Sequence, residues 1–258
     1  MRVASVDRVQ PALNGSTPRG LAWHAIDRAP APVRRYLRHV LQDDAAPVTA
    51  ARFTQRGRLR TGSAARRWMA FDALHVVRPA RTEFVWTADV QAFGPLHLRV
   101  IDSLQAGRGA GEVKALSVWR VAASTPCHEL DCGALHRFLA EAVWYPTALV
   151  PGPRLRWTAI DDARALATLS IDTASVALEF RFDGDDQVAS IYTPARWGRF
   201  GRRFEQHGWE GHFSRYQWID GLCVPRHGDV GWFVGPKWER VWEGDVVTAD
   251  YECGVEPA

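Results

Sequence analysis

The pattern of apolar and polar positions has two different periods along this chain. Most segments alternate with a period of two residues, which is typical of strands with one buried face and one wet face. The clearest case is 175–182, where Val176, Leu178, Phe180 and Phe182 alternate with small or charged residues. The pattern therefore predicts a mainly β protein.

About a dozen strands are expected, separated by turns that contain Gly, Asp or Pro. The strand-patterned segments are 51–60, 67–77, 82–90, 96–105, 113–122, 155–159, 165–172, 175–182, 188–192, 209–219, 222–233, 238–242 and 246–251. Hairpin turns are predicted at 183–186, 220–221 and 243–245, and a glycine-rich turn at 107–111. The short, regular spacing favours antiparallel pairing of consecutive strands.

Two segments follow the helical period instead. Segment 31–41 has one apolar face and Pro32 in its first turn. Segment 135–146 has apolar residues at helical spacing, with Asp131 as the expected N-cap and Pro146 as the expected stop. The prediction is an α+β, mainly β fold: a large curved antiparallel sheet, or half-barrel, covered on its concave side by two or three helices.

No linker divides the 258 residues, so we expect a single domain over 1–258, in which 1–30 is a lead segment. The sequence contains 12 Trp but only two Met, which favours broad surfaces made of rigid rings. Its net charge is only +3 and no basic block occurs, so nucleic acid is not an expected partner. Because no apolar run suits an export signal or a membrane span, a cytoplasmic location is expected.

The four cysteines lack the C-x-x-C spacing of zinc or redox sites, so free thiols are expected, although Cys127 and Cys132 could be neighbours. No H-x-x-x-H or H-E-x-x-H spacing occurs, and neither a metal nor a cofactor is expected. The glycines at 107–111 lie between two strands rather than before a helix, which argues against a dinucleotide loop.

Several motifs resemble those of an uncharacterised bacterial domain family. The central one is Gly133-x-Leu135-x-Arg137-x-x-x-Glu141-x-x-Trp144-x-Pro146, followed by Trp157 and Asp161-Asp162. Similar matches occur at 57–60, 68–71, 84–88, 102–109, 209–216 and 224–232, so that the resemblance covers roughly residues 33–251. This family is similar to the LolA and LolB lipoprotein-carrier superfamily, and the resemblance implies a half-barrel closed by helices over an apolar cavity.

Arg137 and Glu141 are the leading candidates for a functional site. They are four residues apart and share a helix face, so they can form a structural ion pair that fastens the helix to the sheet. Alternatively, Glu141 faces a cavity, where desolvation would raise its pKa and suit it to general acid or base chemistry with help from Arg137 or His136. Asp102 is expected either to stabilise a turn or to anchor a ligand head group.

The expected function is binding of a lipid or another apolar small molecule in a Trp-lined cavity. The candidate ligand-binding residues are Trp68, Trp86, Asp102, Trp119, Phe138, Trp144, Tyr216, Trp218 and Trp232. Two alternatives stay open: an isomerase, cyclase or hydrolase that uses Glu141, and a structural or interaction protein whose core is filled. The oligomeric state is not predicted.

Overall fold

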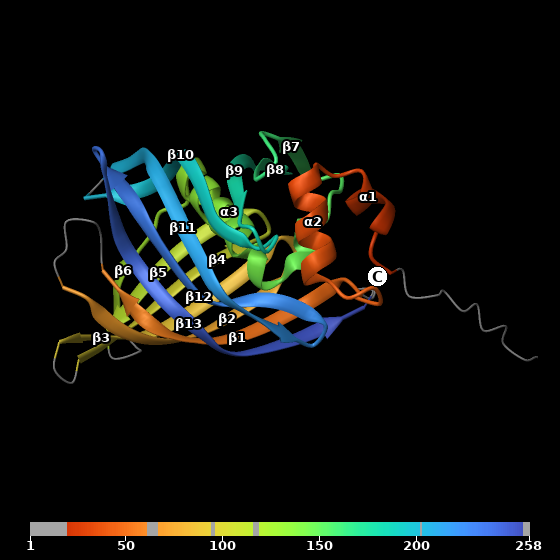
Figure 1. Ribbon diagram of the computed structural model, residues 1–258. Coiled ribbons are helices and arrows are strands. Elements are labelled where there is room, and N and C mark those ends of the chain that lie inside the picture. The colour runs from red at the N-terminus through yellow and green to blue at the C-terminus, as the bar shows by residue number, and fades with distance from the viewer. Residues whose placement is uncertain (1–19, 61–66, 94–95, 116–118, 202, 255–258) are drawn as a thin grey trace, which may run out of the picture.

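A single curved antiparallel sheet dominates the computed structural model, which describes residues 20–60, 67–93, 96–115, 119–201 and 203–254 (Figure 1). The sheet has 13 strands within these residues, in the order β6-β5-β4-β3-β2-β1-β13-β12-β11-β10-β9-β8-β7. All of the pairings are antiparallel. The mainly β architecture predicted from the sequence, a curved antiparallel sheet with few helices, is confirmed.

The bounds of the elements follow the chain. The helices are α1 (Trp23–Asp27), α2 (Ala31–Val40) and α3 (His128–Glu141), with 3-10 turns η1 (Pro79–Arg81), η2 (Ala142–Trp144) and η3 (Pro146–Leu149). The strands are β1 (Val48–Leu59), β2 (Met69–Arg78), β3 (Glu83–Phe93), β4 (Leu96–Gln105), β5 (Arg108–Ala115), β6 (Trp119–Ala123), β7 (Leu155–Ala159), β8 (Arg164–Ile171), β9 (Ala174–Phe182), β10 (Val188–Phe200), β11 (Arg203–Ile219), β12 (Leu222–Val234) and β13 (Lys237–Cys253).

The sheet consists of two meanders that meet in the middle. Strands β1–β6 form one meander and β7–β13 the other, and each pairs its strands in chain order. The two meanders join where β1 pairs with β13, from Val48 opposite Cys253 to Leu59 opposite Trp242. The Thr173 hydroxyl, in the turn between β8 and β9, donates to the Gly107 carbonyl, in the turn between β4 and β5, over 2.9 Å. The curled sheet thus brings a turn of one meander to a turn of the other.

Helix α3 fills the space between the two ends of the sheet. It contacts β4 and β5 of the first meander and β9 and β10 of the second, and Figure 1 shows it lying between them. The Asp131 carboxylate of α3 accepts hydrogen bonds from the Gly109 backbone amide at 2.7 Å and from Arg108 at 3.0 Å, both in β5. Helix α2 lies at one end of the sheet, against β8, β12 and η3.

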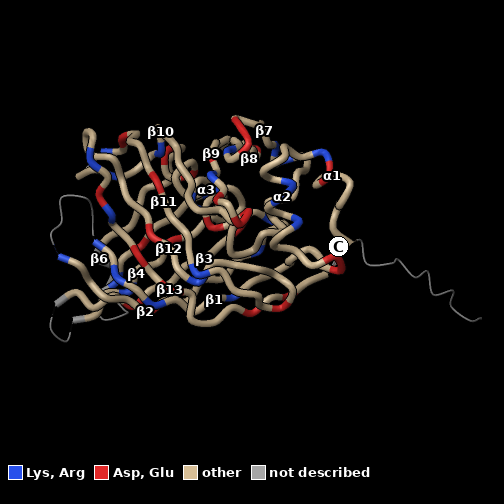
Figure 2. The backbone as a smooth tube through the Cα atoms, in the orientation of Figure 1, with Lys and Arg blue, Asp and Glu red and all other residues tan. Residues whose placement is uncertain are grey.

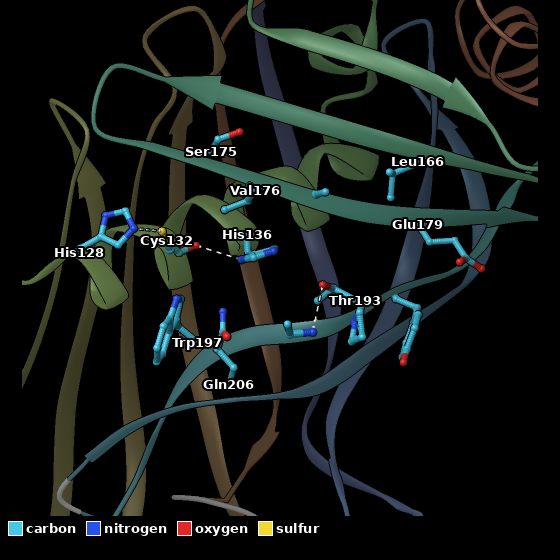
Figure 3. Close-up of a pocket in the computed structure, with 14 residues that line it drawn as sticks. His128, Cys132, His136, Leu166, Ser175, Val176, Glu179, Thr193, Trp197 and Gln206 are labelled. Atoms are coloured by element: carbon cyan, nitrogen blue, oxygen red, sulfur yellow. Dashed lines mark hydrogen bonds between the residues drawn. The ribbon is translucent and has the colours of Figure 1, made fainter.

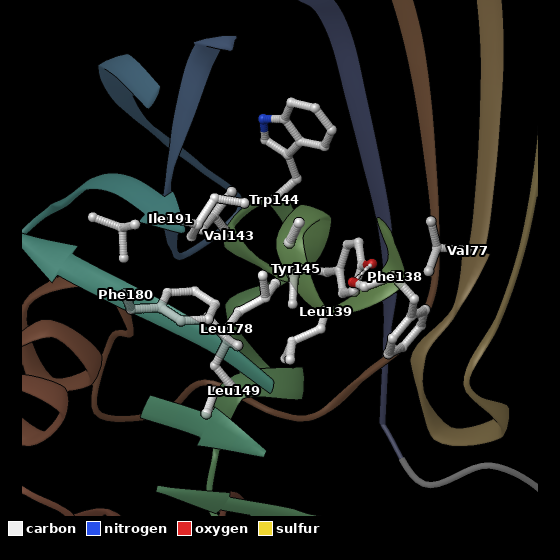
Figure 4. Close-up of a cluster of buried hydrophobic side chains, with 14 of the residues drawn as sticks. Val77, Phe138, Leu139, Val143, Trp144, Tyr145, Leu149, Leu178, Phe180 and Ile191 are labelled. Atoms are coloured by element: carbon white, nitrogen blue, oxygen red, sulfur yellow. Dashed lines mark hydrogen bonds between the residues drawn. The ribbon is translucent and has the colours of Figure 1, made fainter. Parts of the chain in front are cut away.

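The core lies between the helical segment 128–149 and the concave face of the sheet. Figure 4 shows Phe138, Val143 and Tyr145 from this segment among side chains of β2, β9 and β10. The Tyr145 hydroxyl is buried and donates to the Phe138 carbonyl over 2.7 Å, so this polar group is satisfied inside the core. The segment therefore packs against both meanders at once.

Helix α3 begins earlier than the sequence pattern predicted. Its N-cap is Cys127, so the prediction that Asp131 caps the helix is wrong. Asp131 instead lies in the first turn and uses its carboxylate to hold β5, as described above. The α-helix ends at Glu141, and the two 3-10 turns η2 and η3 carry the chain through the predicted stop at Pro146. The second predicted helix, 31–41, corresponds closely to α2.

Three strand boundaries also differ from the prediction. Residues 243–245 do not form a hairpin but lie inside β13, opposite 56–58 of β1. The predicted strand 113–122 is divided between β5 and β6. Most of the predicted turn at 107–111 belongs to β5, because only Ala106 and Gly107 adopt the positive φ that the turn requires. Gly109 and Gly244 occur where chains pack closely rather than where a strand ends.

Charged residues of both signs interleave over the view in Figure 2, in keeping with the small net charge. All four cysteines are free thiols. Among the helices within the described ranges, none has the length and apolar character required to cross a membrane.

Gly57→Ala is expected to destabilise the central seam of the sheet. Gly57 of β1 lies opposite Gly244 of β13, and a Cβ at residue 57 would overlap the Glu243 carbonyl oxygen and lie 2.7 Å from the Gly244 Cα. Overpacking of this kind costs about 1–3 kcal/mol of unfolding free energy, which urea denaturation measures. As the control, Gly184→Ala meets no atom within 4 Å and is expected to have little effect. Equal stability of the two variants would contradict the proposed close packing at the seam.

Candidate functional site

Arg137 ties helix α3 to the sheet through two carboxylates. Its Nη1 donates to Asp102 Oδ2 of β4 at 2.6 Å, and its Nε donates to Glu141 Oε1 at 2.9 Å. The guanidinium carbon also lies 4.9 Å from the ring centroid of Trp86 and 5.2 Å from that of Phe84. The ion pair expected from the i,i+4 spacing is therefore present, and Asp102 completes a triad that includes the sheet.

The triad holds charge in a largely dry environment. Burial raises the pKa of Glu141, although Arg137 opposes this shift by stabilising the carboxylate. The pKa of Arg137 is raised as well, because its two carboxylate partners outweigh the desolvation that acts in the opposite direction. Arg137 therefore stays cationic, while burial favours the protonated form of Glu141.

His75 of β2 lies beside the free oxygen of Glu141. Its Nε2 is 3.4 Å from Glu141 Oε2, and its side chain is fully buried between Phe53 and Phe84. Within the described residues, neither ring nitrogen of His75 nor Glu141 Oε2 has a hydrogen-bond partner. Burial, reinforced by Arg137, lowers the pKa of His75 well below its usual value, so the imidazole is neutral.

A pocket of about 270 Å³ opens beside the triad, and we call it the tryptophan pocket. It lies between α3, η2 and the strands β3, β4 and β10–β13. Its aromatic lining consists of Trp86, Trp144, Trp209, Phe213 and Trp242. Its charged lining consists of Arg60, Asp102, Arg137, Glu141, Arg196 and Asp229. Aromatic walls with a few polar groups are the usual make-up of a small-molecule site.

The predicted site residues divide between this pocket and other places. Trp86, Asp102 and Trp144 line the tryptophan pocket together with Arg137 and Glu141. The Trp86 indole N–H donates to the buried Gln55 Oε1 at 2.8 Å, which fixes that ring in the wall. Five of the predicted residues thus gather at one site.

The remaining predicted aromatic residues are placed elsewhere. Trp68 packs against the guanidinium groups of Arg58 and Arg60, and Phe138 is in the core. The Tyr216 hydroxyl donates to the Val188 carbonyl at 3.0 Å, and Trp218 is 52% exposed. Trp232 contacts Arg196, with its ring centroid 5.2 Å from the guanidinium carbon, while the side chain of Trp119 lies outside the described residues.

Sequence reasoning missed His75, Arg196, Trp209 and Trp242. A signal was present for two of them. His75 lies on the buried face of β2, which it shares with Phe71 and Val77. It is therefore a polar residue at a position where the alternation predicts an apolar one. Trp209 likewise occupies a buried position in β11. Arg196 follows a bulge in β10, at which the register shifts between Thr193 and Arg196, and such a shift is invisible to a two-residue pattern.

A second, broader pocket of about 640 Å³ lies on another side of α3, and we call it the histidine pocket. Figure 3 shows His128, Cys132 and His136 of α3 facing residues of β9 and β10, among them Glu179 and Thr193. His136 therefore does not join Glu141 at one site, although both belong to the same helix. The expected assistance of Glu141 by His136 has no geometric basis here.

The histidine pocket is poorly suited to nucleophilic chemistry. Cys132 Sγ lies 3.3 Å from His128 Nε2, but burial raises the pKa of this thiol and keeps it protonated. His136 Nδ1 lies 3.2 Å from the Cys132 carbonyl oxygen. Burial, together with Arg196, lowers the pKa of His136 to about 4. The described residues also contain no cluster of three or more potential metal ligands.

His136→Gln is expected to weaken the pH dependence of stability. Because the pKa of His136 is about 4 in the folded protein and about 6.5 in the unfolded chain, only the unfolded chain binds this proton as the pH falls between those values. The stabilisation is present above pH 6.5 and is lost toward pH 4, by up to about 3 kcal/mol. Urea denaturation at about pH 7 and about pH 4 measures this difference, which the variant should reduce.

The exposed His39→Gln serves as the control for this experiment and should follow the wild type. An equally steep loss of stability in His136→Gln would show that other groups account for the pH dependence.

Comparison with solved structures finds a match of low similarity. The crystal structure of a LolA superfamily protein from Nitrosomonas europaea matches with a TM-score of 0.42 and 8% sequence identity, over 90% of this chain and 94% of that one. No curated protein sequence matches. A family model described as a family of unknown function, DUF6544, matches residues 22–243. The chain belongs to this family.

Proposed function

We propose that the protein binds a small molecule with an apolar body in the tryptophan pocket. The observation that carries this proposal is the pocket itself, about 270 Å³ in volume and walled by Trp86, Trp144, Trp209, Phe213 and Trp242. A core that served only for stability would fill such a space, because close packing is favourable throughout protein interiors. The aromatic walls favour an apolar ligand, since burial of apolar area is the main gain on binding.

The size of the pocket limits the ligand. Pockets for drug-sized molecules span roughly 300–1,000 Å³, so a pocket of this volume lies just below that range. A water molecule occupies about 30 Å³ in the liquid, and the pocket therefore suits a body of on the order of ten non-hydrogen atoms. A single short chain or one or two rings fits this space, whereas a lipid with two long chains does not fit inside it.

Ala140→Leu is expected to weaken binding by filling the pocket. Ala140 is a buried residue of α3 on the pocket wall, and leucine adds three carbon atoms there without lowering helix propensity much. Octan-1-ol, titrated by calorimetry, should bind the wild type at a single site and bind this variant about tenfold more weakly or worse. Ala31→Leu places the same side chain on α2 and should bind octan-1-ol like the wild type.

Two results would contradict the proposal. The first is the absence of saturable octan-1-ol binding to the folded wild type. The second is binding that Ala140→Leu leaves unchanged, because the ligand would then lie elsewhere. Native mass spectrometry of the purified protein adds an independent readout, since a copurifying apolar compound would appear as an adduct of defined mass.

A second candidate function is supported by Glu141. This residue lines the tryptophan pocket, its Oε2 has no hydrogen-bond partner within the described residues, and burial raises its pKa. A carboxyl group of this kind is suited to move a proton on a bound apolar substrate. The neutral imidazole of His75 lies 3.4 Å from this carboxyl group. Turnover lost in Glu141→Gln while binding persists would favour the enzyme.

The Glu141 carboxyl group is expected to stay protonated above the pH at which an ordinary glutamate ionises. Its pKa is raised from a usual value of 4.5 mainly by burial. The infrared difference spectrum between wild type and Glu141→Gln, recorded through a pH titration, should show a protonated carboxyl band that disappears only at higher pH. Loss of that band near the usual pKa would rule out Glu141 as a general acid. The proposal that the pocket binds an apolar ligand would not be affected by that result.

A further inference from the structure

Arg196 is one of the arginine residues that line the tryptophan pocket. Its Nη2 donates to the Gly133 carbonyl of α3 at 3.0 Å, and its guanidinium carbon packs 4.5 Å and 5.2 Å from the ring centroids of Trp209 and Trp232. No acidic side chain of the described residues makes a salt bridge with it. Its Nε is shielded from solvent and has no acceptor within the same residues.

Four of the five other charged side chains that line the pocket are already paired. Arg137 holds both Asp102 and Glu141, at 2.6 Å and 2.9 Å. Asp229 is held by His212 at 2.8 Å and by Arg240 at 3.5 Å. The carboxylates of Asp102 and Glu141 act on Arg196 only through space, since their close contacts are with Arg137.

Arg196 remains charged despite its surroundings. Desolvation lowers its pKa to about 10, which still leaves the guanidinium cationic at neutral pH. A buried cation without a carboxylate partner is unfavourable, and it becomes favourable when an anion is supplied. The bulge between Thr193 and Arg196 directs this side chain toward α3 and the pocket, so the unfavourable position is built into the strand.

Two further hydrogen-bond donors of the pocket lack acceptors. The indole N–H groups of Trp144 and Trp209 are both buried, and neither meets an acceptor among the residues that the structure describes. Arg196 Nε, on the same pocket lining, is also without an acceptor among these residues. Buried donors without partners are rare in folded proteins, and a ligand that supplies acceptors satisfies them.

We infer that the ligand of the tryptophan pocket is an amphipathic anion, whose charged head group pairs with Arg196 while its apolar body lies against the tryptophan rings. This inference rests on the proposed function and specifies the chemical class of the ligand. A carboxylate or a sulfate ester meets the requirement, because both present acceptor oxygens that match an arginine fork. The apolar body has on the order of ten non-hydrogen atoms, as the pocket volume requires.

The test compares eight-carbon chains that differ in their head groups: octanoate, octyl sulfate, octan-1-ol and octylamine. Calorimetric titration of the wild type should give affinities for octanoate or octyl sulfate about tenfold or more above that for octan-1-ol. Octylamine should bind least tightly, because its charge has the same sign as that of Arg196. The order of the two anions tells a carboxylate preference from a sulfate preference.

Arg196→Met removes the charge and keeps a side chain of similar length. Its affinities for octanoate and octyl sulfate should fall to about its own affinity for octan-1-ol, so that the preference for the anions is lost. Arg199→Met changes an exposed arginine three residues along the same strand, and it should retain the preference. Arg196→Lys keeps the charge without the guanidinium Nε and should retain part of the preference, which keeps the test available if Arg196→Met does not fold.

The outcomes distinguish the proposal that the pocket binds an apolar molecule from the inference that the head group of this molecule is an anion. If no eight-carbon ligand binds, the proposed function itself fails. If octan-1-ol binds as tightly as the anions, the pocket binds apolar molecules but the anionic head group is wrong. If octylamine binds most tightly, Asp102 and Glu141 rather than Arg196 anchor the head group, and the inference is overturned.

Discussion

The position of helix α3 against the sheet depends on the triad of Arg137, Asp102 and Glu141. The helix lies between the two ends of a curved sheet, and Arg137 is the side chain that links its polar face to β4. Removing one partner from a buried ionic group leaves an uncompensated charge, which typically costs more than the intact group contributes. The triad therefore fixes the orientation of α3, and with it the walls of the pockets on either side of the helix.

One helix separates two environments of different chemistry. On one side, Glu141 and Arg137 face rings and arginine residues in a compact pocket; on another side, His136 and Cys132 face a broader and more open pocket. Burial shifts the pKa of three of these groups toward the neutral form: upward for Glu141 and Cys132, downward for His136. Of these two pockets, only the compact one combines a group with a shifted pKa, Glu141, with hydrogen-bond donors that have no acceptor among the described residues. For that reason we place the proposed ligand there.

The sequence predicted much of the fold but only part of the site. Two-residue alternation located nearly all of the strands, because each has one face against the core, and the spacing of Arg137 and Glu141 predicted their contact. Alternation could not locate Arg196, since a bulge shifts the register of β10 just before it. It also could not place Trp209 and Trp242 in the same pocket as Trp86, because that arrangement depends on the curvature of the sheet. Glycines at 244 and 107–111 misled the prediction, since close packing and turns favour the same residue.

The pairing of β1 with β13 has a consequence for how the chain folds. Val48 lies opposite Cys253, so the centre of the sheet is made from segments near the two ends of the described sequence. During synthesis each meander can form by local hairpins, but β1 and β12 keep unpaired edges until residues 237–253 have left the ribosome. Closing so long a loop is entropically costly and slow compared with hairpin formation. The last strand of the described residues is thus the one that joins the two halves, and a nascent chain without it presents two edges open to aggregation.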